Sequence, residues 1–194
     1  MKNKNNRMQE FPPFRALKFF MENPYQEVYL RQLAKELKLS AFATKKYADI
    51  LVKESLLKEE RKANLRYFRA NVSNLFFRHL KIAFSINFLL KLGLLEFLKE
   101  KIPNVSSIIL FGSVAKGEDD KSSDVDILVI GKRVHVDMTA FEEKSRRINL
   151  HVFSWSEWNR KAKNDMAFYF EVISHYIALF GELPLITEHG KQWK

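Results

Sequence analysis

The sequence predicts an α+β protein of two small domains, a helical domain first and then a domain in which strands and helices alternate. Apolar residues recur at helical spacing through residues 12–54. Two short apolar runs in the second half, 106–111 and 124–130, read as strands around a polar, glycine-containing loop. The length of 194 residues and the hydrophobic content of 46% suffice for two packed cores.

The first domain begins with three predicted helices. The first helix starts at Pro12-Pro13, because proline suits a helix start, and ends at Asn23-Pro24. The second covers residues 29–37, where leucine and alanine recur at helical spacing. The third covers residues 41–54, behind the favoured N-cap residue Ser40. Its predicted buried stripe consists of Ala43, Tyr47, Ile50 and Leu51.

Two strands, 56–60 and 65–70, are predicted next, around a charged turn. Three helices followed by a basic hairpin resemble the winged-helix variant of the helix-turn-helix found in many prokaryotic regulators, over residues 12–73. In that fold one helix enters the major groove, while the hairpin reaches phosphates or the minor groove. The residues expected to contact double-stranded DNA are Thr44, Lys45, Lys46, Arg61, Lys62 and Arg66.

Basic charge is concentrated in the first half of the chain. The formal net charge is +10, and residues 1–80 hold 17 Lys and Arg against 8 Asp and Glu. This distribution favours a polyanionic partner, nucleic acid before membrane. A winged helix that instead contacts a protein partner or dimerises stays an alternative.

A connecting helix rich in Phe and Leu is predicted over residues 74–92. Its hydrophobicity indicates burial on several sides, between the domains or in a homodimer. Charged residues interrupt its most apolar part, so we expect no membrane-spanning helix. The second domain is predicted for residues 93–185. Its expected elements are a helix up to Lys101, strands 106–111, 124–130 and 148–153, and helices 139–147 and 165–180.

The chemically distinctive residues of the second domain lie where these strands meet the loop between them. Gly112-Ser113 follows the first strand, and glycine lets the backbone turn sharply and approach a phosphate. Asp124 and Asp126 are two residues apart, so their side chains lie on one face of the second strand. Such a carboxylate pair favours a hard divalent cation over a place in the core.

Gly112-Ser113, a spacer of ten residues and Asp124-Val125-Asp126 together resemble the signature of the DNA polymerase beta-like nucleotidyltransferase superfamily, in its minimal, antibiotic-nucleotidyltransferase-like branch. The resemblance implies a small α/β nucleotidyltransferase domain with a short mixed sheet behind the winged helix-turn-helix. It also implies Mg²⁺, a nucleoside triphosphate donor, and transfer of a nucleoside monophosphate to a hydroxyl of a protein or small molecule. The expected metal-binding and catalytic residues are Asp124 and Asp126. The expected nucleotide contacts are Gly112, Ser113, Lys116 and Ser123.

The resemblance further implies a third carboxylate on a later strand, where this chain has Asn149 and His151 on the matching face. His151 is therefore a candidate catalytic base or an unusual ligand, and Asn149 a candidate neutral oxygen ligand. The alternative is a site that binds nucleotide without turnover. The protein would then be a DNA-binding transcriptional regulator whose second domain senses nucleotide or dimerises.

Cysteine usage and the first residues set an expectation for the compartment. The chain has no cysteine, which excludes disulfides and Cys-based zinc sites. Its polar start has no apolar segment of a signal peptide, so we expect a cytoplasmic protein. Minimal nucleotidyltransferases often occur in toxin–antitoxin pairs, so the resemblance implies a toxin or antitoxin partner that can also be the acceptor.

Overall fold

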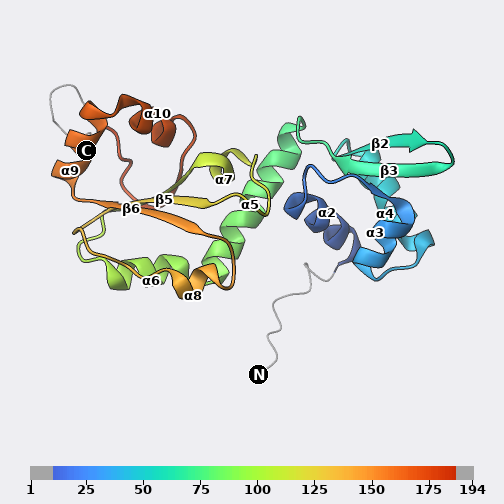
Figure 1. Ribbon diagram of the computed structural model, residues 1–194, viewed down its shortest axis with the longest axis horizontal. Coiled ribbons are helices and arrows are strands. Elements are labelled where there is room, and N and C mark those ends of the chain that lie inside the picture. Colours follow the sequence, from blue (N-terminus) through green and yellow to red (C-terminus); the bar gives the residue numbers. More distant parts are fainter. Residues whose placement is uncertain (1–10, 187–194) are drawn as a thin grey trace. The chain divides into compact units, whose positions relative to one another are not determined.

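A computed structural model describes residues 11–186 of the chain (Figure 1). The described residues group into two compact units, residues 11–80 and residues 81–186. The division between Leu80 and Lys81 falls inside the segment 74–92, which the sequence predicts as a connecting helix. No helix in the described part of the chain is both long and apolar enough to cross a membrane.

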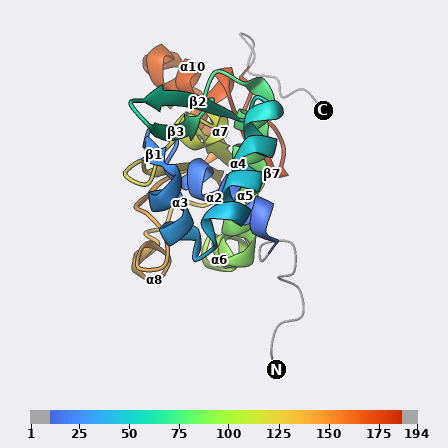
Figure 2. The same cartoon turned by 90° about the vertical axis from the view of Figure 1, so that its right-hand side faces the viewer.

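The first unit is a winged helix-turn-helix. Strand β3 pairs with β1 on one side and with β2 on the other, and Figure 2 shows the β2–β3 hairpin. Its elements are α2 (Pro12–Glu22), β1 (Val28–Tyr29), α3 (Leu30–Leu37), α4 (Ala41–Lys53), β2 (Leu57–Lys62) and β3 (Leu65–Ala70). The predicted order of three helices and a hairpin is confirmed. Strand β1 was not predicted, because two residues are too few to show alternation.

Helix α4 begins as predicted behind Ser40, whose Oγ accepts a hydrogen bond of 3.2 Å from the backbone N–H of Ala43. Of the predicted buried stripe only Leu51 is buried, while Ile50 is exposed. The other buried residues of the helix are Thr44 and Ala48, which the prediction left out. Thr44 tolerates burial because its hydroxyl donates to the carbonyl oxygen of Ser40 at 2.9 Å. The prediction that Thr44 lies on a DNA-facing surface is therefore wrong.

The second unit is a four-stranded sheet with helices on both faces. Helix α5 (Leu75–Lys91) contains the division between the units. The other elements are α6 (Leu94–Lys101), β4 (Ser107–Phe111), α7 (Gly112–Lys116), β5 (Val125–Ile130), α8 (Thr139–Glu142), β6 (Ile148–Phe153), α9 (Trp155–Asn164), α10 (Met166–Ser174) and β7 (Ile177–Gly181). The strand order is β6-β5-β4-β7, with β5 and β6 parallel and the other pairs antiparallel. The mixed sheet implied by the resemblance is confirmed.

Each face of this sheet has its own core. On one face, α5 and α6 pack against side chains of β4 and β5 in a cluster that includes Leu89, Leu98, Ile108, Leu110, Ile127 and Val129. On the other face, α9 and α10 pack in a cluster that includes Ile109, Phe111, Leu128, Ile130, Trp158 and Val172. Because β4 and β5 are covered on both faces, they are apolar almost throughout instead of alternating with polar residues.

The predicted helix 165–180 is wrong beyond Ser174. Residues Ile177–Gly181 instead form β7, antiparallel to β4. Ile177 and Leu179 are more buried than Ala178, which is the period of a strand. Gly181 has a φ of +73°. A Cβ at this position would overlap the backbone carbonyl of Ser106, the residue directly before β4. The predicted helix 139–147 is also too long, because α8 ends at Glu142.

Candidate functional site

Gly112 lies at the turn from β4 into α7. Its φ of +72° is in the left-handed region, which glycine adopts at little cost. A second reason requires glycine here: a Cβ would overlap Oδ2 of Asp126 and lie 3.1 Å from its Cγ. Phe111, just before this turn, is paired with Asp126 across the antiparallel strands. The two halves of the sequence motif therefore meet at one place.

Asp126 lies directly opposite Asn149 in the parallel pair β5–β6. The Nδ2 of Asn149 donates to Oδ2 of Asp124 at 3.1 Å and to Oδ1 of Asp126 at 3.0 Å. Both aspartates are partly exposed, and no ion pair found within residues 11–186 involves either carboxylate. The structure thus brings together the three side chains that the sequence places on one face.

The two carboxylates and the Asn149 amide suit a magnesium ion whose remaining ligands are water and substrate oxygens. In proteins Mg²⁺ is commonly held through one or two carboxylates together with water and phosphate oxygens. Half a turn of the Asn149 amide exchanges Nδ2 for Oδ1, which directs a neutral oxygen toward Asp124 and Asp126. Within the described residues no three acidic, His or Cys side chains gather as a metal site, so the third carboxylate implied by the resemblance is not found here.

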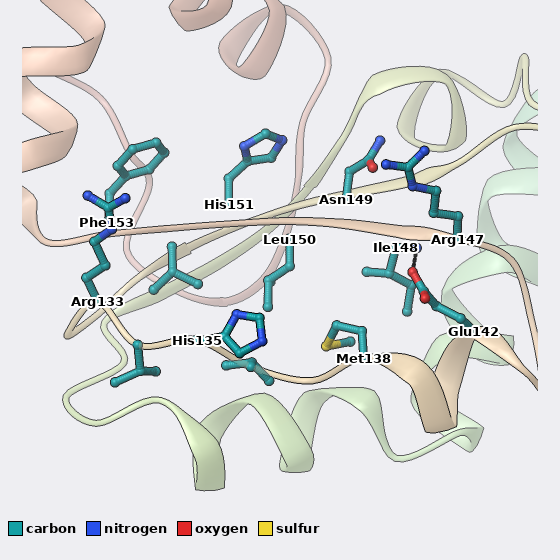
Figure 3. A pocket seen from close by; sticks show the side chains of 13 residues that line it. Arg133, His135, Met138, Glu142, Arg147, Ile148, Asn149, Leu150, His151 and Phe153 are labelled. Atoms are coloured by element: carbon teal, nitrogen blue, oxygen red, sulfur yellow. Dashed lines mark hydrogen bonds between the residues drawn. The ribbon is translucent and has the colours of Figure 1, made fainter.

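His151 projects from the same face of β6 as Asn149, as Figure 3 shows. Its ring contacts two aromatic rings that also contact each other, with centroid distances of 5.8 Å to Phe111 and 5.2 Å to Phe168. Burial lowers the pKa of His151 below its usual value, and the negative charge of Asp126 opposes this shift. The imidazole therefore favours its neutral form, which accepts a proton.

The predicted nucleotide contacts differ in how free their side chains are. Ser113 and Lys116 lie on α7 and are partly exposed. Ser123 is part of a tight turn, in which its Oγ accepts a hydrogen bond of 3.0 Å from the backbone N–H of Asp120. Hydrogen bonds from Ser122, and then from Ser123, lower the pKa of Asp120. Ser123 thus shapes the loop that leads into Asp124, and its contact with nucleotide stays a prediction.

A buried ion network holds the other end of this loop, and the sequence did not reveal it. The Nζ of Lys81, which is 1% exposed on α5, pairs with the carboxylate of Asp119 and donates to its carbonyl oxygen at 2.5 Å. Arg146 donates to the other carboxylate oxygen at 2.8 Å and to the carbonyl of Asp120 at 2.5 Å. Burial lowers the pKa of Lys81, and the contact with Asp119 opposes that shift. A lysine inside an apolar helix was the available signal.

The basic residues proposed to contact DNA fall into two groups. Lys45 and Lys46 are exposed on α4, and the Arg61 side chain is 78% exposed at the tip of the hairpin, 3.7 Å from Glu59. Lys62 is engaged more closely, because its Nζ lies 2.5 Å from Oε2 of Glu27. This contact with Glu27 raises the pKa of Lys62.

Arg66 differs from these exposed basic residues, because its guanidinium is held by two acidic side chains. Its Nη2 lies 2.5 Å from Oδ1 of Asp49 and 2.7 Å from Oε2 of Glu59, and its Nε donates to Glu59 at 2.7 Å. Its hydrogen bonds, the one to Glu59 above all, raise the pKa of Arg66. The expectation of a guanidinium free to reach DNA is therefore wrong for Arg66, which ties the hairpin to α4.

The second half of the chain is similar to a known protein family. The family model of the nucleotidyltransferase domain matches residues 93–170. This segment contains Gly112, the pair Asp124 and Asp126, and Asn149, so the matched residues include the whole candidate site. Among curated proteins, none matches this chain.

Two solved structures show a low similarity to the chain. NolR from Sinorhizobium fredii is 16% identical, with a TM-score of 0.31 over 44% of this chain and 90% of its own. TrmBL2, an archaeal chromatin protein whose structure shows a novel mode of DNA binding, is 12% identical, with a TM-score of 0.29 over 86% of this chain and 71% of its own. Neither likeness adds to the description of the fold.

Proposed function

We propose that this protein is a Mg²⁺-dependent nucleotidyltransferase that moves a nucleoside monophosphate from a nucleoside triphosphate to a hydroxyl of a protein or small molecule. We propose further that its winged helix binds double-stranded DNA. The observation that supports the transferase most is the meeting of Gly112 with Asp126, which Asn149 joins to Asp124, inside a segment that matches the nucleotidyltransferase domain.

The residues of the site divide the work of such a transfer. Gly112 lets the main chain approach the triphosphate, while Ser113 and Lys116 supply a hydroxyl and a positive charge to its oxygens. Asp124 and Asp126 would hold the metal ion, which would supply positive charge to the α-phosphoryl group and the leaving pyrophosphate. Phosphoryl transfer depends mainly on such positioning and charge.

In the proposed reaction, Asn149 and His151 act near the acceptor hydroxyl. Asn149 orients both carboxylates through its amide. The neutral imidazole of His151 accepts the proton of the attacking hydroxyl. Because His151 and Asn149 project from the same face of β6, the acceptor hydroxyl reaches base and carboxylates from one side.

The test is incubation of the purified protein with Mg²⁺ and α-³²P-labelled ATP, CTP, GTP or UTP, with extract of its own cells as the source of acceptor. Label on a protein or small molecule, lost in an Asp124→Asn/Asp126→Asn variant, is the expected result. Glu143→Gln, a change at an exposed carboxylate, is the matched control and should keep the label. Equal labelling by the double variant would remove the support for this site.

A specific observation favours a second candidate function, a DNA-binding regulator that binds nucleotide without transferring it. Asn149 stands where the resemblance implies an acid, which leaves the metal site with two carboxylates. In that case Mg²⁺-dependent binding of nucleoside triphosphate appears without labelled product, and the nucleotide changes the affinity for duplex DNA. Titration of labelled duplex with and without nucleotide separates the two functions.

A further inference from the structure

Strand β6 is an edge strand, and half of its main-chain groups point away from the sheet. Arg147 accepts a hydrogen bond from Val125 at 2.9 Å, and Phe153 accepts one from Gly131 at 2.9 Å. In a strand, the residues in alternate positions direct both of their main-chain groups to the same side. Residues 147, 149, 151 and 153 therefore face β5, while residues 148, 150 and 152 face outward.

The outward edge is open over most of its length. The N–H of Ile148 donates to Oε1 of Glu142 at 2.9 Å, which blocks one end. In the sheet formed by the described residues, no strand follows β6 on its outer side. The N–H and C=O groups of Leu150 and Val152 thus offer the pattern that a further extended chain satisfies.

A groove of about 850 Å³ runs along this edge, lined by all residues of β6, by residues 133–136 and by Met138 (Figure 3). Its apolar lining comes from Val134, Val136, Met138, Ile148, Leu150, Val152 and Phe153. This volume is in the range of a ligand site, roughly 300 to 1,000 Å³. A strand-shaped groove with open main-chain groups fits a peptide better than a compact small molecule.

The charge of the groove is predominantly basic. Arg133, His135 and Arg147 line it, and Glu142 is the single acid among its lining residues. The Glu142 carboxylate is already engaged by the N–H of Ile148. Arg133 lies 3.5 Å from Glu157 with its side chain 73% exposed, and no ion pair of the described residues includes Arg147. Acidic side chains therefore complement both ends of the groove.

Two residues connect the groove with the candidate catalytic site. Asn149 and His151 both line the groove, and the amide of Asn149 contacts both Asp124 and Asp126. A peptide side chain that lies beside Asn149 is consequently separated from the two carboxylates by the Asn149 amide alone.

We propose that this groove binds an extended acidic segment of an acceptor protein, which pairs with β6 as an added strand and presents a Ser, Thr or Tyr hydroxyl beside Asn149. This inference rests on the proposed transferase function. The hydroxyl oxygen forms a bond to the α-phosphorus of the nucleoside triphosphate. The bond between the α-phosphorus and the bridging oxygen breaks, and pyrophosphate leaves with its electrons. The hydroxyl proton passes to His151 or to water. A second copy of the chain is a poorer occupant, because it would bring another set of Arg133 and Arg147 against the first.

The probe is a fluorescein-labelled ten-residue peptide of alternating Val and Glu with one central Tyr. Fluorescence anisotropy measures its binding to the full-length Asp124→Asn/Asp126→Asn variant, so that binding is read without transfer. We expect at least tenfold weaker binding when Lys replaces Glu in the peptide, and a comparable loss when alternate peptide nitrogens are methylated. Equal binding of all three peptides would overturn the proposal.

Variants of the protein locate the binding. Arg147→Glu should weaken binding of the acidic peptide at least tenfold, while Lys163→Glu, an equal charge change at an exposed residue outside the groove, should not. Val152→Pro removes an outward N–H, which an edge strand tolerates, and should also weaken binding. Circular dichroism checks that each variant is folded. Unchanged binding by folded Arg147→Glu and Val152→Pro, or self-association of the chain in place of peptide binding, would rule out this occupant.

The two proposals fail in different ways. If the peptide binds in the groove but the wild-type protein labels neither its Tyr nor any other acceptor, the docking site is supported and the transferase is ruled out. If another acceptor is labelled but the peptide does not bind, the transferase is supported and the docking site is ruled out.

Discussion

Asn149 lies opposite Asp126 across the parallel strands β5 and β6, and its Nδ2 is 3.0 Å from Oδ1 of that aspartate. The same amide reaches Asp124 at 3.1 Å. A neutral donor thus lies between two carboxylates whose like charges repel each other. The pair is held in place by hydrogen bonds and stays open to a cation that replaces them.

Asn149→Asp replaces this donor by a third carboxylate. We expect a lower midpoint of thermal unfolding without Mg²⁺, because three like charges then gather, and a larger rise on addition of Mg²⁺ than in the wild type. Transfer of labelled nucleotide should increase, by roughly tenfold if metal affinity limits it. Asn87→Asp, at an exposed position of α5, is the control. A response to Mg²⁺ equal to that of the control would argue against a metal at this place.

Gly112→Ala tests the close approach of the main chain to Asp126. Alanine in the left-handed region costs roughly 1–2 kcal/mol at any site, and at this site its Cβ also overlaps the carboxylate. Gly93→Ala is a matched control, because Gly93 has a φ of +74° with nothing within 4 Å of the added Cβ. We expect both variants to be less stable, but only Gly112→Ala to lose transfer activity, by roughly 100-fold. Comparable activities of the two variants would contradict this role of Gly112.

Lys81→Met should destabilise the fold strongly, because it leaves Asp119 buried with Arg146 as its remaining partner. Removal of one partner of a buried ion pair costs about 3–5 kcal/mol. The free energy of unfolding is measured by urea denaturation. Lys91→Met, at an exposed position of the same helix, should change it little. Similar losses in both variants would show that the buried contact is unimportant.

Lys45→Ala/Lys46→Ala should weaken binding to duplex DNA and reduce its dependence on salt. Each lost phosphate contact lowers the slope of log K against log salt by about 0.9. Arg66→Ala should leave that slope unchanged and lower stability instead, since Arg66 is held by Asp49 and Glu59. Anisotropy titrations at several salt concentrations measure the slope. A reduced slope in Arg66→Ala would mean that its ion pairs open on DNA.

The part of the site that the sequence predicts is the part that depends on local geometry. Strand alternation is sufficient to place Asp124 and Asp126 on one face, and Asn149 follows once β6 is predicted as a strand. The requirement for Gly112 also follows from a sharp turn. The overlap with Asp126 does not, because it depends on the register between β4 and β5.

What the sequence did not predict depends on contacts between distant residues. Thr44 counts as polar, yet its hydroxyl is satisfied by Ser40 and the residue is buried. Residues 177–181 are apolar enough for a helix, and pairing with β4 makes them a strand. The ion pairs of Arg66 join residues 7 and 17 positions apart, so charge counting assigned it to DNA.

The contact between Lys81 and Asp119 also has a consequence for the order of assembly during synthesis. These residues are 38 positions apart, so the ammonium group of α5 leaves the ribosome well before its carboxylate partner. Until Asp119 has emerged, burial of Lys81 would leave an unpaired charge in an apolar environment. Residues 11–80 complete their three-stranded sheet without later residues and are free to fold first. The nascent second unit must therefore keep this face of α5 in water until Asp119 emerges. At that stage of synthesis the growing chain is most exposed to aggregation.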